Sequence, residues 1–143
     1  SRGLVGSEMC IRDRSAGDMK LFADLIRRAN PKNLIFSAVD ALLMSSYQLG
    51  APGAIAAILT AAPGPSVKLW NAVQNENWDV ALDLHQKLMP LWDAIGLDNM
   101  PSLCKYAQKL QGLNAGYARK PTSPATKTQK EKVEIALKGL GLI

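Results

Sequence analysis

Residues 34–41 read LIFSAVDA and residues 50–58 read GAPGAIAAI, and these two stretches decide the fold. Residues 34–37 and 53–58 are short and apolar on both faces, which is typical of parallel strands covered by helices. A short helix over residues 40–49 fits between them and ends at a glycine, the residue best suited to a left-handed helix terminus. The sequence therefore predicts an α/β protein with two β/α units. Two units are too few to close a sheet, so we expect this chain to be one part of a larger protein.

Apolar residues recur at helical spacing on both sides of these strands. Residues 19–26 form one amphipathic face, and from residue 63 onward the pattern is helical throughout. In the first of the later helices, Val67, Trp70 and Val73 are predicted to face inward. The chain is thus expected to be mostly helical.

The last helix has a recognisable start. Thr128 and Glu131 have the spacing of a capping box, in which each side chain bonds the other residue's backbone. With this helix placed, we divide the chain into three parts. They are an unstructured segment at 1–14, a partial β/α region at 15–75 and a C-terminal helical extension at 76–143.

The first 14 residues differ from the rest of the chain. Residues 7–14 read SEMCIRDR, which has neither helical nor strand periodicity and mixes charges without order. This segment resembles a translated sequencing-adapter remnant of the kind fused to environmental gene pieces, and we expect it to be foreign to the fold. A natural disordered arm is the alternative.

The composition argues against several classes of function. The net charge is +5, from 17 Lys and Arg against 12 Asp and Glu, and acids interleave with the bases, so we expect no nucleic-acid partner. Cys10, Cys104 and the lone His85 lack the clustered spacing of metal ligands, and the two cysteines predict no disulfide framework. No apolar run approaches the roughly 20 residues of a membrane helix. We therefore predict a cytoplasmic protein with no metal, no cofactor and no membrane partner.

Several segments, taken in their order and spacing, resemble the second half of the dihydrodipicolinate synthase and N-acetylneuraminate lyase family. The resemblance covers residues 15–143. The segments are SAGD at 15–18, FSAVDA at 36–41, LGAPGAIAA at 49–57, LMPL at 88–91, and NMP at 99–101 with Lys105 after it.

This resemblance implies an eight-fold β/α (TIM) barrel followed by a C-terminal helical extension, of which this chain holds the last two strands and their helices. Family members are usually homotetramers, and they use a barrel lysine to form a Schiff base with pyruvate or another 2-oxo acid. The protonated imine is an electron sink, so a carbon–carbon bond can form or break beside it, or water can leave. We therefore expect the parent protein to be a lyase, aldolase or dehydratase acting on a small 2-oxo acid. The sequence does not choose among dihydrodipicolinate synthesis, sialic-acid cleavage and sugar-acid dehydration.

By the same resemblance, the imine-forming lysine lies just before residue 15, where this chain has Asp13 and Arg14. An aspartate cannot form an imine, and an arginine is effectively always protonated. Lys20 lies on the next predicted helix and is expected at its surface. The family's glycine-rich carboxylate-binding loop and its proton-shuttling tyrosine belong to the earlier part of the barrel. We therefore predict no catalytic residue and no activity for this chain as written.

The resemblance leaves one wall of a substrate pocket in this chain. Ile55 falls where the family uses a backbone carbonyl of strand eight near the substrate. Ala38 and Asp40 fall at the end of strand seven, where members select their second substrate. Asp40 is either a partner for a sugar hydroxyl or the N-cap of the helix that follows it. Thr60 falls where lyases of the family often carry an amide, and it is either a substrate contact or a polar loop residue.

A second hypothesis belongs to a different class of function. The helices after residue 63 carry wide apolar faces that need partners, which is typical of a non-catalytic helical protein-interaction module. Such a module would unfold cooperatively at this length. Part of an open barrel would instead expose unpaired strand edges and be poorly stable on its own.

Overall fold

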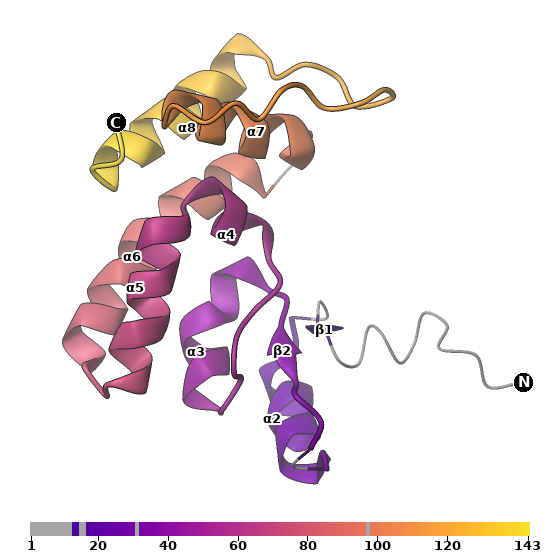
Figure 1. Cartoon of the computed structure of the whole chain (residues 1–143), viewed down its shortest axis with the longest axis vertical. Helices are drawn as coiled ribbons and strands as arrows, with labels where there is room; N and C mark the ends of the chain where they lie inside the picture. The colour runs from indigo at the N-terminus through magenta and orange to yellow at the C-terminus, as the bar shows by residue number, and fades with distance from the viewer. Residues whose placement is uncertain (1–12, 15–16, 31, 97) are drawn as a thin grey trace, which may run out of the picture.

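The structure, a computed structural model, describes residues 13–14, 17–30, 32–96 and 98–143. Helices make up most of it, and a very small parallel sheet lies beside them (Figure 1). The elements in chain order are β1 (Asp13–Arg14), α2 (Met19–Arg28), β2 (Phe36–Ser37), the 3-10 helix η1 (Asp40–Leu42), α3 (Leu43–Gln48), α4 (Ala57–Ala61), α5 (Pro63–Gln74), α6 (Trp78–Ile95), α7 (Met100–Leu110) and α8 (Lys127–Gly139).

The sheet is built around β2. On one side β2 pairs in parallel with β1, and on the other side Ser37 forms an isolated parallel bridge with Ala54. Two hydrogen bonds make this bridge: the Ser37 N–H donates to the Gly53 carbonyl (3.1 Å), and the Ile55 N–H donates to the Ser37 carbonyl (2.8 Å). Three chain segments therefore run in the same direction, with β2 in the middle.

Two of the sequence predictions are wrong at this point. Asp13 and Arg14, which we placed in an unstructured segment, form β1, because parallel pairing with β2 satisfies their backbone groups. The fold thus has a third parallel segment beyond the two strands expected, whereas residues 1–12 lie outside the described residues. The strand expected over residues 53–58 is reduced to the bridge at Ala54, because the alanine-rich segment after it forms α4.

The first helix, α2, follows the sequence pattern closely. Asp18 is its N-cap, and its carboxylate accepts a hydrogen bond from the Leu21 N–H (2.9 Å). Phe22 is the fully buried residue of the helix, while Arg27 and Arg28 lie in the last turn, where cations favour the helix dipole.

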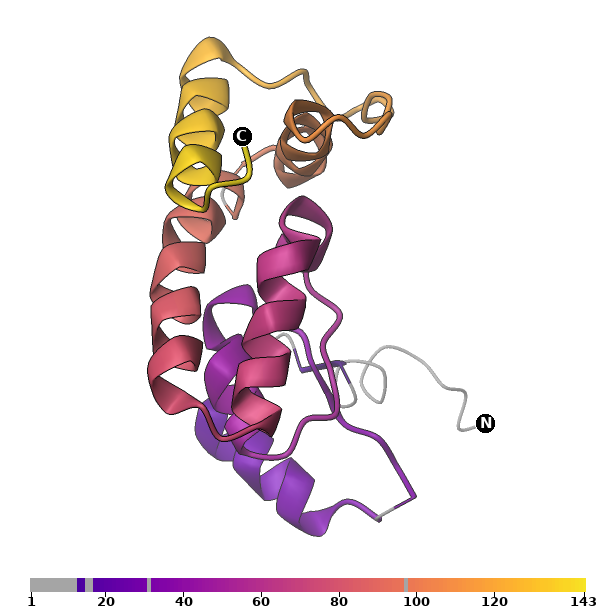
Figure 2. The same ribbon diagram turned by 60° about the vertical axis from the view of Figure 1, so that its left-hand side comes forward.

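The greater part of the core lies among the later helices and is continuous with the buried residues of α2, α3 and α4. Helices α5 and α6 lie side by side, and α8 packs against both α6 and α7 at one end of this pair (Figures 1 and 2). The α5–α6 contact crosses the expected boundary between residues 75 and 76. Val73 is buried as predicted, but Val67 is 58% exposed. The buried face of α5 instead runs through Ser66, Leu69 and Ala72, and its small residues let α6 pack closely.

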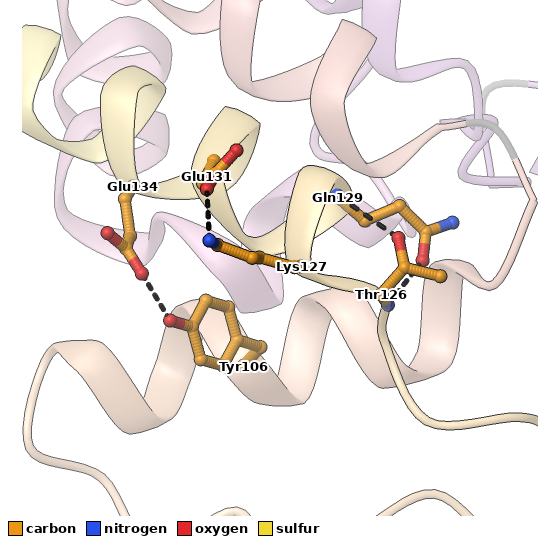
Figure 3. Close-up of polar contacts among 6 residues, drawn as sticks. All are labelled: Tyr106, Thr126, Lys127, Gln129, Glu131 and Glu134. Atoms are coloured by element: carbon orange, nitrogen blue, oxygen red, sulfur yellow. Dashed lines mark hydrogen bonds and ion pairs between the residues drawn. The ribbon is translucent and has the colours of Figure 1, made fainter.

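The last helix begins two residues earlier than predicted. Its capping box is formed by Thr126 and Gln129 instead of Thr128 and Glu131 (Figure 3). The Thr126 hydroxyl accepts from the Gln129 N–H (3.3 Å), and the Gln129 side-chain carbonyl accepts from the Thr126 N–H (2.9 Å). Both pairs have the required spacing, but the amide of Gln129 also donates to the carbonyl of Asp98 (3.3 Å), a tertiary contact that favours this pair.

Candidate functional site

The carboxyl ends of the three parallel segments meet at one edge of the sheet. Residues 38–40 leave β2 at this edge, and residues 55–60 leave the bridge at Ala54 and enter α4. In parallel β/α proteins, groups that bind substrate are carried by the loops at the carboxyl ends of the strands. This edge is therefore the candidate site, and it contains all four predicted site residues.

Asp40 is a buried carboxylate at this edge, 8% exposed. One carboxylate oxygen accepts a hydrogen bond from the Ile58 N–H at 2.6 Å, in the first turn of α4. Asp40 therefore caps a helix 18 residues further along the chain, and not the helix that follows it, whose N-cap is Val39. Burial raises the pKa of Asp40, although backbone hydrogen bonds, including that from Ile58, act in the opposite direction.

Ala38 and Ile55 flank Asp40 at the same edge. Ala38 is half-buried and directly follows the Ser37 bridge. The Ile55 N–H is used in that bridge, while its side chain is 60% exposed. The apolar side chain of Ile55 is therefore accessible to a neighbouring segment or to a ligand.

Thr60 lies one turn into α4 and is not a loop residue. Its hydroxyl donates to the carbonyl of Ala57 within the helix (2.8 Å), and its own carbonyl accepts from the side-chain amide of Gln108 on α7 (3.1 Å). Its polar groups are thus engaged with the protein, although the residue itself is exposed.

Two buried hydroxyls beneath the edge escaped the sequence analysis. Ser37 and Ser46 are almost fully buried, and the Ser37 hydroxyl donates to that of Ser46 at 2.9 Å. They border a cavity of about 10 Å³ beside Val39 and Asp18, which is about the space that one water occupies. The space beneath the candidate site is therefore large enough for a water molecule and not for a substrate.

Cys104, on α7, lies against the same edge. Its thiol is 4.0 Å from the carbonyl oxygen of Ala57, and burial raises its pKa, with the Asp40 charge adding to the rise. The protonated form of a thiol is a weak nucleophile, so Cys104 acts here as a packing residue. Within the part of the chain that the structure describes, no three His, Cys, Asp or Glu residues come together as a metal site, and no helix could cross a membrane.

The position expected for an imine-forming lysine coincides with β1. The backbone of Asp13 and Arg14 lies beside β2, opposite Phe36 and Ser37. Lys20 is exposed on α2, as the sequence analysis predicted. The strand next to β2 thus carries an aspartate and an arginine where the resemblance places a lysine.

The fold and sequence match one family over most of the chain. The profile of the Dihydrodipicolinate synthetase family matches residues 9–140. Relatives include the 4-hydroxy-tetrahydrodipicolinate synthases of Archaeoglobus fulgidus, 30% identical over 129 residues, and of Thermodesulfovibrio yellowstonii, 32% identical over 129 residues. The alignments cover 90% of this chain but 45% and 44% of these relatives, so the chain spans less than half of their length.

Solved structures give the same result for the fold. N-acetylneuraminate lyase from Fusobacterium nucleatum, complexed with pyruvate, matches with a TM-score of 0.75 and 29% identity, over 86% of this chain and 42% of that one. Dihydrodipicolinate synthase from Cyanidioschyzon merolae, with lysine bound, matches with a TM-score of 0.80 and 24% identity, over 90% and 43%. These are TIM-barrel enzymes, and the elements of this chain correspond to part of such a barrel.

Proposed function

Because this chain belongs to the Dihydrodipicolinate synthetase family, we propose that it forms one wall of a lyase pocket that takes pyruvate or another 2-oxo acid as a Schiff base. The observation that carries the proposal is the parallel arrangement of β1, β2 and Ala54, which brings residues 38–40 and 55–60 to one edge. The pyruvate named with the N-acetylneuraminate lyase of Fusobacterium nucleatum supports the choice of substrate class.

In this proposal the four site residues have different roles. Ile55 offers its backbone at the end of the third segment, close to the bound 2-oxo acid. Ala38 and Asp40 lie at the end of β2, on the side of the second substrate. Asp40 is first a positioning residue, because its carboxylate holds the N-terminus of α4 against the sheet edge (2.6 Å to the Ile58 nitrogen). Thr60 lies further out on α4 as an outer contact.

We propose that this chain does not form the imine by itself. An imine needs a nucleophilic amine at the sheet edge, and neither Asp13 nor Arg14 of β1 supplies one. In this proposal the remaining walls belong to the other part of the barrel, and a lysine is needed at the β1 position that Asp13 and Arg14 occupy in this chain. In this proposal those walls, together with Ala38 and Asp40, determine which second substrate binds and therefore which reaction of the family takes place.

The proposal extends to assembly of the whole protein into a homo-oligomer. Trp78 and Leu82 lie one turn apart on α6, and both are close to half exposed. An exposed tryptophan beside an exposed leucine is typical of a surface that another protein surface covers.

The test is a chimera in which residues 17–143 of this chain follow the first part of the Archaeoglobus fulgidus synthase, cut after its imine-forming lysine. Pyruvate and borohydride are added, and the intact mass is measured. We expect a reduced pyruvate adduct on the chimera, none on the present chain, and none on a chimera with that lysine replaced by arginine.

The same experiment can refute the proposal. A chimera that unfolds cooperatively on heating, and so has assembled, but takes up no pyruvate would overturn it. The unmodified synthase, trapped under the same conditions, controls for the chemistry.

A further inference from the structure

A second cavity lies away from the sheet edge, between α7, the segment 113–126 and the first turn of α8. Its volume is about 160 Å³, which is much larger than the cavity beside Ser37. Four of its lining residues come from α7: Ser102, Lys105, Tyr106 and Lys109. Lys105, Tyr106 and Lys109 follow Ser102 by three, four and seven residues. The four side chains therefore lie in one stripe along the helix.

The opposite stripe of α7 faces α4, the helix that follows the sheet edge. Cys104 lies against Ala57, Gln108 donates to the carbonyl of Thr60, and the side-chain amide of Gln111 donates to the carbonyl of Ala61 (2.7 Å). The cavity is thus separated from the candidate substrate site by the thickness of α7. It forms a site of its own.

The cavity is strongly basic. Lys105, Lys109 and Lys130 line it, and its described lining contains no carboxylate. Two of these ammonium groups contact other parts of the protein: that of Lys105 donates to the carbonyl of Ala115 (2.6 Å), and that of Lys130 lies 5.4 Å from the centre of the Tyr106 ring. Positive charges held in one concave surface attract an anion more strongly than the same charges on flexible side chains.

The nearby acidic groups of α8 have partners of their own. The Tyr106 hydroxyl donates to Glu134, and Glu131 lies 4.0 Å from Lys127 on α8 (Figure 3). The bond to Glu134 raises the pKa of Tyr106 to about 12, so this ring adds no negative charge to the cavity. Glu134 is outside the lining, and the excess of positive charge in the cavity remains.

We propose that this cavity binds a small oxyanion with two negative charges, such as inorganic phosphate or a short dicarboxylate. The ammonium groups of Lys105, Lys109 and Lys130 surround the anion, and the side chain of Thr122 completes the polar lining. The cavity volume of about 160 Å³ accommodates a ligand of a few heavy atoms. This anion binding is separate from the proposed lyase chemistry and does not depend on it.

The experiment titrates the full chain with inorganic phosphate at constant ionic strength, maintained with sodium chloride, while amide resonances are recorded. We expect saturable shifts confined to α7, residues 113–126 and the start of α8. Lys109→Met and Lys130→Met should each weaken binding about tenfold, as expected for the loss of one charge-assisted hydrogen bond. Lys138→Met is the matched control, because this exposed lysine of α8 lies outside the cavity, and it should leave the affinity unchanged.

A parallel titration with succinate identifies the class of anion. Tighter binding of phosphate indicates a tetrahedral oxyanion, and tighter binding of succinate indicates a dicarboxylate; each result supports the site. Shifts that never saturate with either anion would overturn it, as would equal weakening by Lys109→Met and Lys138→Met. Lys109 is exposed, so its substitution should leave the amide spectrum of the fold intact. Lys109→Arg, which keeps the charge, should retain most of the affinity.

Discussion

The β/α region from β1 to α4 (residues 13–62) and the helical region from α5 onward (residues 63–143) differ in how their chain is packed. In the helical region, α5 to α8 enclose a core in which Leu91 and Leu137 are completely buried. In the β/α region the strands are two residues long, and Leu34 and Ile55, which flank them, are both more than half exposed. One region has a closed core, and the other has an open sheet edge.

The difference follows from the way each element satisfies its backbone. A helix makes its own hydrogen bonds and needs a partner along only one face. A parallel strand needs neighbours on both edges and helices on both faces. Three parallel segments therefore leave backbone groups and apolar faces that only further strands and helices can cover. The four helices α5 to α8, by contrast, are enough to close a core. The candidate site lies in the open region, and the proposed anion site lies in the closed one.

The largest expected effect compares one buried leucine from each region. Leu91→Ala in α6 and Leu43→Ala in α3 remove the same atoms from side chains that are 0% and 1% exposed. Leucine-to-alanine changes in cores cost about 2–5 kcal/mol, and the cost is larger where the surroundings cannot collapse. We expect Leu91→Ala near the top of this range and Leu43→Ala near the bottom, measured by urea unfolding followed by circular dichroism.

Ile135→Ala serves as the control for this pair. Its side chain is 71% exposed on α8, so its loss should change the free energy of unfolding by less than about 0.5 kcal/mol. If Leu43→Ala costs as much as Leu91→Ala, the two regions are equally well packed and the contrast between them is wrong.

The next effect is the cost of adding a methyl group to a glycine that lies close to an aromatic ring. A Cβ at Gly96 would lie 2.8 Å from the Trp92 ring, whereas one at Gly53 would lie 3.2 Å from the Phe36 ring. We expect Gly96→Ala to cost about 1–3 kcal/mol through overpacking, and Gly53→Ala to cost less, because Phe36 borders the open edge and can move. Thermal unfolding of both variants gives the comparison.

Gly139→Ala is the neutral counterpart. It lies at the end of α8, and an added Cβ meets nothing within 4 Å, so the replacement should be tolerated or slightly stabilising. A Gly53→Ala variant less stable than Gly96→Ala would show that the sheet edge is the more rigid of the two regions.

Local signals in the sequence predict some elements correctly and others wrongly, and the errors arise where tertiary contacts decide. The amphipathic face predicted over residues 19–26 is present in α2, whereas the local capping-box spacing of Thr128 and Glu131 is misleading, because Thr126 and Gln129 cap α8. Residues 53–58 fit either a strand or a helix, because a short apolar run has no decisive period. The helix propensity of the alanines and the hydrogen bond from the Ile58 N–H to the Asp40 carboxylate favour the helix α4. Because Asp40 lies 18 residues before Ile58, the local sequence does not reveal this contact.

The same limit applies to the two sites. Resemblance to a family predicts that Asp40, Ile55, Ala38 and Thr60 form one wall of a pocket. The structure brings residues 38–40 and 55–60 to one edge of the sheet, and their part in binding stays a prediction. The basic cavity could be foreseen only in part: Lys105 and Lys109 share a helix face by their spacing, but Lys130 joins them through the packing of α8 on α7. Only the fold brings this third lysine to the others.

The smallest expected effect lies at the junction of sheet edge and α4. Burial raises the pKa of Asp40, so the native state holds this proton more tightly than the unfolded state does. Stability linked to Asp40 is therefore highest below the ordinary aspartate pKa of about 3.9 and falls as pH rises through the higher native value. Asp40→Asn removes this titration but keeps an oxygen that can accept from the Ile58 N–H. The unfolding free energies of the two proteins are measured from pH 3 to 7. We expect the stability of the Asp40→Asn variant, relative to the unmodified protein, to increase as pH rises. A difference that moves the other way would mean that the bond from Ile58 outweighs desolvation, and that the open region holds this carboxylate as firmly as a closed core would.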